Sequence, residues 1–217
     1  MYWFKSNNKQ NNIYIDMTKR LNSKYSVCKS LSTEYKNLWG LNKKNSLNAL
    51  LKLKDRKKRP SVYGKLLNIK RSLRFFYSNI KETSFKNYIN YSVKSPSKTI
   101  DKFISILESR LDSVLFRSCL VKSFHEARQL INHKHVYING VSSCLPDKKL
   151  YSGDLVQLKN VILDKKSFTD ILTTRSIPNY LEIDFKNLTI VFLHDAKFKN
   201  AYYPVKAKYW TINRFYR

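Results

Sequence analysis

Three of the four histidines of the chain, His125, His133 and His135, lie in one short stretch, SFHEARQLINHKHVYINGV (residues 123–141). Imidazoles so close in sequence can ligate a metal ion or donate hydrogen bonds to a polyanion. A structural zinc ion needs four ligands in a tetrahedral set. His125 and His133 are about two helical turns apart, and no nearby Cys, Asp or Glu completes such a set. We therefore expect no metal and no cofactor, and favour histidines that donate to phosphate or stack on a base.

A helix must position the first part of this stretch. Ser123 and Glu126 have the Ser-x-x-Glu spacing of a capping box, which starts a helix. One side of that helix is apolar and consists of Phe124, Ala127, Leu130 and Ile131. The opposite side consists of His125, Arg128, Gln129 and Asn132. The polar side has donors, one fixed charge and no carboxylate, which suits phosphate and sugar oxygens.

Short strands follow the helix. Alternation in HVYINGV (135–141) predicts a strand, and Asn139-Gly140 supplies the two left-handed residues of a type I′ hairpin turn. LYSGDLVQL (150–158) predicts another turn and strand. Before the stretch, ILESRLDSVLFRSCL (106–120) predicts one helix, whose apolar face consists of Leu107, Leu111, Val114 and Leu115. Residues 106–158 thus predict a unit of two helices followed by a small sheet.

The part before this unit is helical and basic. In KLKDRKKR (52–59), six of eight residues are basic, which favours contact with phosphate in so basic a chain. RPSVYG (59–64) predicts a turn, and residues 65–89 predict an amphipathic helix. Its core face consists of Leu66, Ile69, Leu73, Phe76, Tyr77 and Ile80, and its cationic face of Lys70, Arg71 and Arg74. SPSKT (95–99) predicts a linker to the next unit.

The ends of the chain differ from each other. Residues 1–24 are rich in Asn and Lys and show little periodicity, so we expect a weakly ordered extension. They lack the long apolar segment of a secretory signal and the Arg- and Ser-rich pattern of a transit peptide. NYLEIDF (179–185) and LTIVFL (188–193) predict strands, and a basic, aromatic tail follows them.

Composition narrows the class of partner. The chain of 217 residues is 42% hydrophobic, enough for a core, and carries 42 Lys+Arg against 15 Asp+Glu, a net charge of +27. A domain of that charge repels itself unless a polyanion neutralises it, and nucleic acid is the first expectation. No run of 18 apolar residues predicts a membrane span. Cys28, Cys119 and Cys144 are too unevenly spread for a disulfide framework or a zinc site, so we expect reduced thiols.

Residues 106–158 closely resemble the S-four RNA-binding module. Four motifs carry the resemblance: Arg110-Leu111-Asp112, Ser123 through Ile131, Val136 through Gly140, and Gly153 through Val156. Outside the module, residues 58–89 resemble the segment that precedes it in the family of small-subunit ribosomal protein number four. The segment IPNYLEIDF (177–185) is similar to the return strand of that family, with Tyr180 in place of Trp.

The resemblance implies a structural protein of the small ribosomal subunit that is not an enzyme. Members bind the 5′ domain of small-subunit rRNA early in assembly, contact neighbouring ribosomal proteins and lie near the mRNA entry side. No membrane partner is implied. The frequent Lys, Asn, Ile and Tyr residues suit an AT-rich coding sequence. Together with the divergent N-terminus, this bias favours a mitochondrial ribosome, with another AT-rich organelle as the alternative.

Two other classes of protein carry the same module. Pseudouridine synthases have an Arg-Leu-Asp triplet whose Asp is the nucleophile, followed by Thr-x-Gly-Leu. Here Asp112 is followed by Ser-Val-Leu-Phe-Arg, so we interpret it as a helix residue that orients an arginine. RNA chaperones with one such module normally lack the helices expected at 58–100 and the return strand.

The predicted fold class is α+β. A helical rRNA-binding domain (25–105) follows the extension (1–24), precedes the module (106–158), and is completed by C-terminal strands and a tail (159–217). The mechanism expected is readout of RNA shape and backbone, through phosphate and 2′-hydroxyl contacts. The candidate RNA-binding residues are Arg56, Lys57, Lys58, Arg59, Lys70, Arg71, Arg74, Arg110, Arg117, Ser123, His125, Arg128, Gln129, His133 and Lys134.

Overall fold

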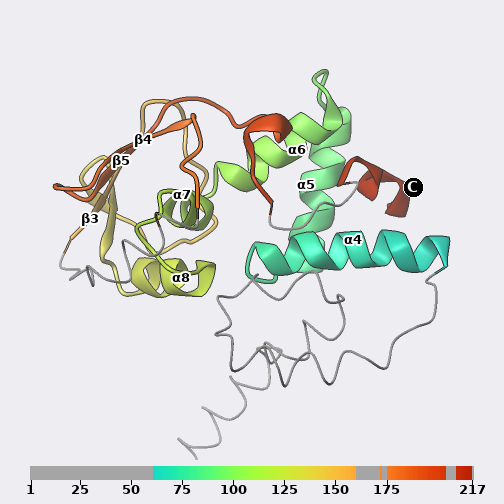
Figure 1. Ribbon diagram of the computed structural model, residues 1–217, viewed down its shortest axis with the longest axis horizontal. Helices are drawn as coiled ribbons and strands as arrows, with labels where there is room; N and C mark the ends of the chain where they lie inside the picture. Colours follow the sequence, from blue (N-terminus) through green and yellow to red (C-terminus); the bar gives the residue numbers. More distant parts are fainter. Residues whose placement is uncertain (1–60, 160–171, 173–174, 204–208, 217) are drawn as a thin grey trace, which may run out of the picture. The chain divides into compact units, whose positions relative to one another are not determined.

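The computed structural model of the chain describes residues 61–159, 172, 175–203 and 209–216 (Figure 1). Along these residues a run of α-helices is followed by the strands of one small antiparallel sheet, so the predicted α+β class is confirmed. The predicted extension at 1–24, the basic run at 52–59 with Arg56, Lys57, Lys58 and Arg59, and Cys28 lie outside the described residues. No helix in the described part is long and apolar enough to cross a membrane.

The amphipathic segment expected at 65–89 forms two helices rather than one. Helix α4 (Val62–Phe76) begins after Ser61, whose hydroxyl accepts the Gly64 amide, and α5 (Glu82–Lys94) follows a short turn. Ser78 and Asn79 have φ of 57° and 55°, a left-handed conformation that ends a helix. The core face is nevertheless largely as predicted, because Leu73, Phe76, Tyr77 and Ile80 are buried. Leu66 and Ile69 are half-buried.

The single helix expected at 106–120 is wrong. Helix α6 (Thr99–Glu108) ends before Arg110, whose extended backbone forms a β-bridge with Lys149, and α7 (Leu111–Arg117) begins after it. The amide of Leu111 is bound by the Lys148 carbonyl instead of a carbonyl one helical turn earlier. All four predicted apolar positions are still buried, because the break changes the path of the backbone and leaves both halves facing the core.

The sheet has the strand order β2-β1-β3-β5-β4 and is antiparallel throughout. Strand β1 (Val136–Ile138) pairs with β2 (Val141–Ser142) through the predicted hairpin, and its Asn139 and Gly140 have φ of 50° and 84°. Strand β3 (Leu155–Leu158) pairs with β1 on one side and with β5 (Thr189–Phe192) on the other. Strand β4 (Leu181–Asp184) pairs with β5, so both strands expected in the C-terminal part extend the sheet of the module.

Helices α7 and α8 (Phe124–Asn132) share one apolar core with this sheet. The core includes Leu111, Leu115 and Ile131 from the helices and Val156 and Ile190 from the strands. Burial of such side chains is the main stabilising contribution to the fold, at about 1.5–3 kcal/mol for each one fully removed from water.

A second set of contacts involves the C-terminal residues. After the short helix η2 (Phe198–Asn200), Tyr203 packs against Phe76 at the end of α4, with ring centroids 5.4 Å apart. Helix η3 (Tyr209–Phe215) packs against α4, and Phe215 stacks on Tyr63 at 5.5 Å. The C-terminal segment therefore contacts the helices that precede the module in sequence.

Candidate nucleic-acid interface

Helix α8 starts as the capping box predicts, with one difference. The Ser123 hydroxyl accepts a hydrogen bond from the Glu126 amide at 3.2 Å. The Glu126 carboxylate accepts from the amide of Lys122 and not from that of Ser123. The Lys122 amide lies just before the helix, and the carboxylate supplies its hydrogen-bond acceptor.

The two faces of α8 are as expected. Phe124, Ala127 and Ile131 are buried, and Leu130 is half-buried. His125, Gln129 and Asn132 are exposed. Gln129 and Asn132 therefore present hydrogen-bonding groups to solvent, whereas His125 and Arg128 also make contacts within the protein.

Arg128 has its guanidinium directed into the protein. Its Nε donates to Asp112 Oδ2 at 2.9 Å, its Nη1 to the Ser78 carbonyl at 2.7 Å, and its Nη2 to the Tyr77 carbonyl at 3.0 Å. We expected no acidic partner from its own helix, and the acid comes from α7. Arg128 therefore connects α8 with the turn between α4 and α5, and the side chain remains 26% exposed.

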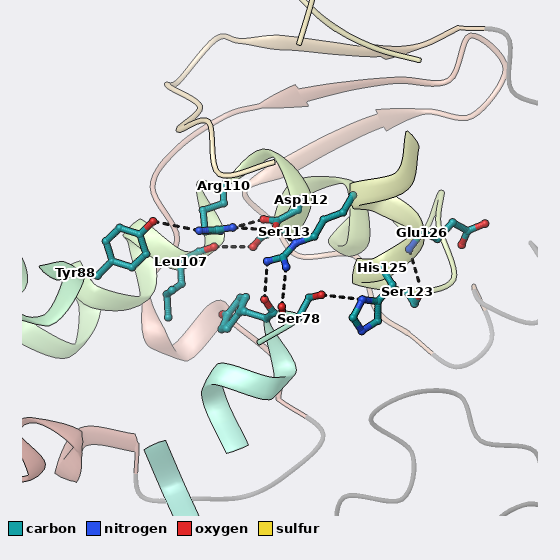
Figure 2. A network of polar contacts seen from close by, with 11 residues as sticks. Ser78, Tyr88, Leu107, Arg110, Asp112, Ser113, Ser123, His125 and Glu126 are labelled. Atoms are coloured by element: carbon teal, nitrogen blue, oxygen red, sulfur yellow. Dashed lines mark hydrogen bonds and ion pairs between the residues drawn. The ribbon is translucent and has the colours of Figure 1, made fainter. Parts of the chain in front are cut away.

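Asp112 is the centre of this network (Figure 2). Its carboxylate is 1% exposed and also accepts two hydrogen bonds from Arg110, at 3.0 and 2.9 Å. Burial lowers the pKa of Arg110, but the hydrogen bond and charge of Asp112 outweigh it, so the net shift is upward. The predicted role of Asp112, to orient an arginine, is confirmed for two arginines.

Two further contacts surround Asp112, as Figure 2 shows. Arg110 donates to the Tyr88 hydroxyl of α5 at 3.1 Å, and the Ser78 hydroxyl lies 3.0 Å from His125 Nδ1. The module is therefore joined to both α5 and the α4–α5 turn by side chains that were selected as candidate RNA ligands.

A second buried network surrounds Glu108. This residue is 0% exposed, and its carboxylate accepts two hydrogen bonds from Arg117, at 2.9 and 2.6 Å. The hydroxyls of Tyr77 and Tyr180 also donate to it, at 2.6 and 2.8 Å. Burial and the nearby Glu108 charge raise the pKa of both tyrosines, so these hydroxyls stay protonated as donors.

Sequence reasoning missed Glu108. It lies next to Leu107 and one helical turn after Ile104, both fully buried. A carboxylate within such an apolar stripe signals a buried polar centre, because an isolated buried charge is strongly unfavourable. The expected helix through 106–120 would not have brought Arg117 onto it, since the two residues belong to different helices.

The cations of α4 also face a carboxylate. Lys70 Nζ and Arg74 Nη1 bind Glu82 at 2.7 and 2.6 Å, and Lys70 also lies 4.0 Å from the centre of the Phe215 ring. Lys70 is buried, contrary to its expected place on a cationic outer face. Burial would raise the pKa of Glu82, but hydrogen bonds from Lys70 and Tyr216 and the Arg74 charge lower it.

The candidate RNA-binding residues within the described part fall into three groups. Exposed are Arg71, His125, Gln129, His133 and Lys134. Half-buried are Arg74, Ser123 and Arg128. Buried are Lys70, Arg110 and Arg117. Contact with RNA stays a prediction for all of them, and the buried group can act on RNA only through the residues that it positions.

The remaining histidines do not form a metal site with their neighbours. The rings of His133 and His135 are 6.3 Å apart and tilted. In the described part of the chain, no group of three or more His, Cys, Asp or Glu residues could hold a metal ion.

Comparison with known proteins agrees with this geometry. The family model of the S4 domain matches residues 109–156, which include α7, α8, strands β1 and β2 and the first two residues of β3. A small ribosomal subunit protein uS4 from Rhodospirillum rubrum is 31% identical over 206 residues, covering 92% of this chain and 99% of the relative. The protein of the same name from Pelagibacter ubique is 32% identical over 195 residues, covering 87% and 94%.

The fold and the donor-rich face of α8 thus define a protein with an S4 domain. The full-length similarity is more specific than the domain, because it also covers the helices before it and the strands after it. The chain belongs to the family of small ribosomal subunit protein uS4.

Proposed function

We propose that this chain is a structural constituent of the small ribosomal subunit and binds small-subunit rRNA directly. The family supports this assignment, and so does the net charge of +27. The protein is not an enzyme. Asp112, the residue that a pseudouridine synthase would use as a nucleophile, is 1% exposed and engaged by two arginines.

One observation carries the proposal: Asp112, the acid that contacts α8 through Arg128, is buried and paired with arginines. Asp112 is neutralised by Arg110 and Arg128, and Glu126 accepts the amide of Lys122. The exposed side of α8 presents His125, Gln129 and Asn132, and none of these three is a carboxylate. RNA phosphate and 2′-hydroxyl groups can approach such a surface without repulsion.

Readout of shape and backbone is the mechanism that this surface supports. Bases in an RNA double helix are hidden in a deep and narrow groove, so contacts to phosphate and 2′-hydroxyl dominate. We assign direct contacts to the exposed candidates, Arg71, His125, Gln129, His133 and Lys134. Ser123, Arg74 and Arg128 combine internal contacts with partial exposure, whereas Lys70, Arg110 and Arg117 act by positioning.

The finer features of the function are also proposals. The target is the 5′ domain of the rRNA, where binding nucleates assembly, and the site lies near the mRNA entry side, beside neighbouring ribosomal proteins. Residues 25–105 and 106–158 act as two RNA-binding parts, and the C-terminal tail returns to the first. The ribosome is mitochondrial, which the Lys-, Asn-, Ile- and Tyr-rich composition supports.

The experiment that tests the proposal is sedimentation of a native extract after a moderate high-salt wash, with identification of the RNA that travels with the chain. We expect the chain to stay with the small subunit and its rRNA. Release as a free protein, or co-sedimentation with tRNA, would refute the assignment.

A matched pair of variants tests the surface itself. Lys134→Gln on the α8 side should weaken binding to a transcript of the small-subunit rRNA and lower the salt slope by about one. Lys186→Gln, on the turn after β4 beside Asp184, should change neither. Equal behaviour of the two variants would contradict the proposed surface.

A further inference from the structure

Helix α5 has a polar side that neither the sequence motifs nor the S4 domain accounts for. Phe85, Ile89 and Ser92 are buried on one side of the helix. The exposed residues of the other side are Thr83, Lys86, Asn87, Asn90, Tyr91 and Lys94. These residues recur at helical spacing and include no carboxylate, and within the described part of the chain none of them forms an ion pair.

A hollow of about 290 Å³ opens beside this side of α5. Ile89, Val93 and the Tyr216 ring provide apolar walls, and Asn90, Lys94 and Asn213 provide amides and a cation. Pockets for small molecules are typically about 300–1,000 Å³. This hollow is at the lower end of that range, so it suits a small ligand such as a single planar ring system. Val93, which lines the hollow, is 53% exposed, and Tyr91 on the same helix is 61% exposed.

The wall contributed by Tyr216, the residue after η3, is held in place. The Tyr216 hydroxyl donates to Glu82 Oε1 at 2.7 Å, and the neighbouring Phe215 stacks on Tyr63. Glu82 is also bound by Lys70 and Arg74, so the one carboxylate at the start of α5 is neutralised. The hollow therefore has a preorganised wall and no unpaired acid at its edge.

We propose that this hollow binds one unpaired nucleobase of RNA, and that the adjoining side of α5 binds its backbone. An amide can pair with the edge of any base, and a tyrosine ring stacks on its face. Lys86 and Lys94 lie on the same side and bind the flanking phosphates. The inference rests on the proposed function, since it names a second contact site on the same rRNA.

The test uses the full-length chain and a transcript of the small-subunit rRNA from the same genome. Val93→Trp fills the hollow from an exposed position, and Lys94→Gln removes the cation. We expect Val93→Trp to weaken binding by roughly tenfold to a hundredfold, the usual loss for one stacked base. Lys94→Gln should lower the salt slope by about one. Chemical probing should show one unpaired base that the wild-type chain protects and Val93→Trp leaves reactive.

Leu193→Trp, at the end of β5, and Lys186→Gln are the matched controls and should bind as the wild type does. Circular dichroism confirms that each variant is folded. Wild-type affinity and an unchanged probing pattern for Val93→Trp would overturn the inference. If the wild-type chain itself fails to bind the transcript, the proposed function fails instead.

A photoreactive amino acid in place of Tyr91, in assembled small subunits, distinguishes RNA from protein as the partner of this side of α5. A cross-link to rRNA supports the proposal. A cross-link to a neighbouring protein alone would overturn it and assign this side of α5 to a protein interface.

Discussion

Replacement of Glu108 should be among the most destabilising single changes in the described part of the chain. The carboxylate is fully buried and is the acceptor for Arg117, Tyr77 and Tyr180. In Glu108→Ala, the Arg117 guanidinium keeps the Tyr202 carbonyl as a partner but loses its counter-ion. Removal of one member of a buried ion pair costs about 3–5 kcal/mol. The buried Tyr180 hydroxyl loses its bond to the carboxylate, which adds about 1–3 kcal/mol, whereas the Tyr77 hydroxyl keeps the Tyr203 hydroxyl as a partner at 2.6 Å.

These contributions are large compared with a typical free energy of unfolding of about 5–15 kcal/mol. We therefore expect Glu108→Ala to lower that free energy by at least about 3 kcal/mol. Urea unfolding followed by circular dichroism measures the change. Glu182→Ala, an exposed carboxylate on β4, is the control and should stay within about 0.5 kcal/mol of the wild type.

A double-mutant cycle tests the physical reason. Glu108→Met and Arg117→Met each leave a buried charge, whereas the double variant leaves none. The double variant should therefore be less destabilised than the sum of the single variants. A loss below about 1 kcal/mol in Glu108→Ala, or strict additivity in the cycle, would refute the argument.

Three further outcomes follow from the geometry. Arg128→Ala should weaken rRNA binding, because the α4–α5 turn loses two donors, and lower the salt slope by about one; an unchanged slope would leave Arg128 only its internal role. The pKa of Glu82 is lowered from its ordinary value of 4.5 in the folded protein. Ionised Glu82 therefore stabilises the fold at pH values above 4.5, and this contribution is lost as the pH falls through the folded pKa. The difference in unfolding midpoint between wild type and Glu82→Gln should thus shrink in acid, and a constant difference would contradict it. Gly140→Ala meets no atom within 4 Å but keeps a φ of +84°, so urea unfolding should show a loss of about 1–2 kcal/mol from strain alone.

Local signals in the sequence were sufficient for the module. The capping box at Ser123 and the Asn139-Gly140 turn each depend on neighbours within a few residues, and both are present in the structure. The helix breaks were not predictable in the same way. Arg110 leaves the helix because its backbone bridges Lys149, 39 positions later. The residues next to Arg110 in the sequence give no signal of so distant a partner.

The side of α4 that faces solvent was also misjudged for Lys70. Periodicity placed it opposite the core, but η3 returns from the far end of the chain and covers it with Phe215. The spacing of apolar residues identifies the core side of a single helix. It does not show which distant segment of the chain will pack on the polar side. Glu108 is the converse case: the sequence shows its position in an apolar stripe but not the side chains that donate hydrogen bonds to it.

The hydrogen bonds from Arg128 to the α4–α5 turn have a consequence for which mutations this turn can tolerate during evolution. Two of its hydrogen bonds go to backbone carbonyls of Tyr77 and Ser78, and every amino acid supplies that group. Substitutions at Ser78 can therefore drift without loss of this bond, provided that the left-handed backbone is kept. Insertion or deletion of one residue would move both carbonyls at once. Selection should therefore conserve the number of residues in this turn more strictly than their amino-acid types.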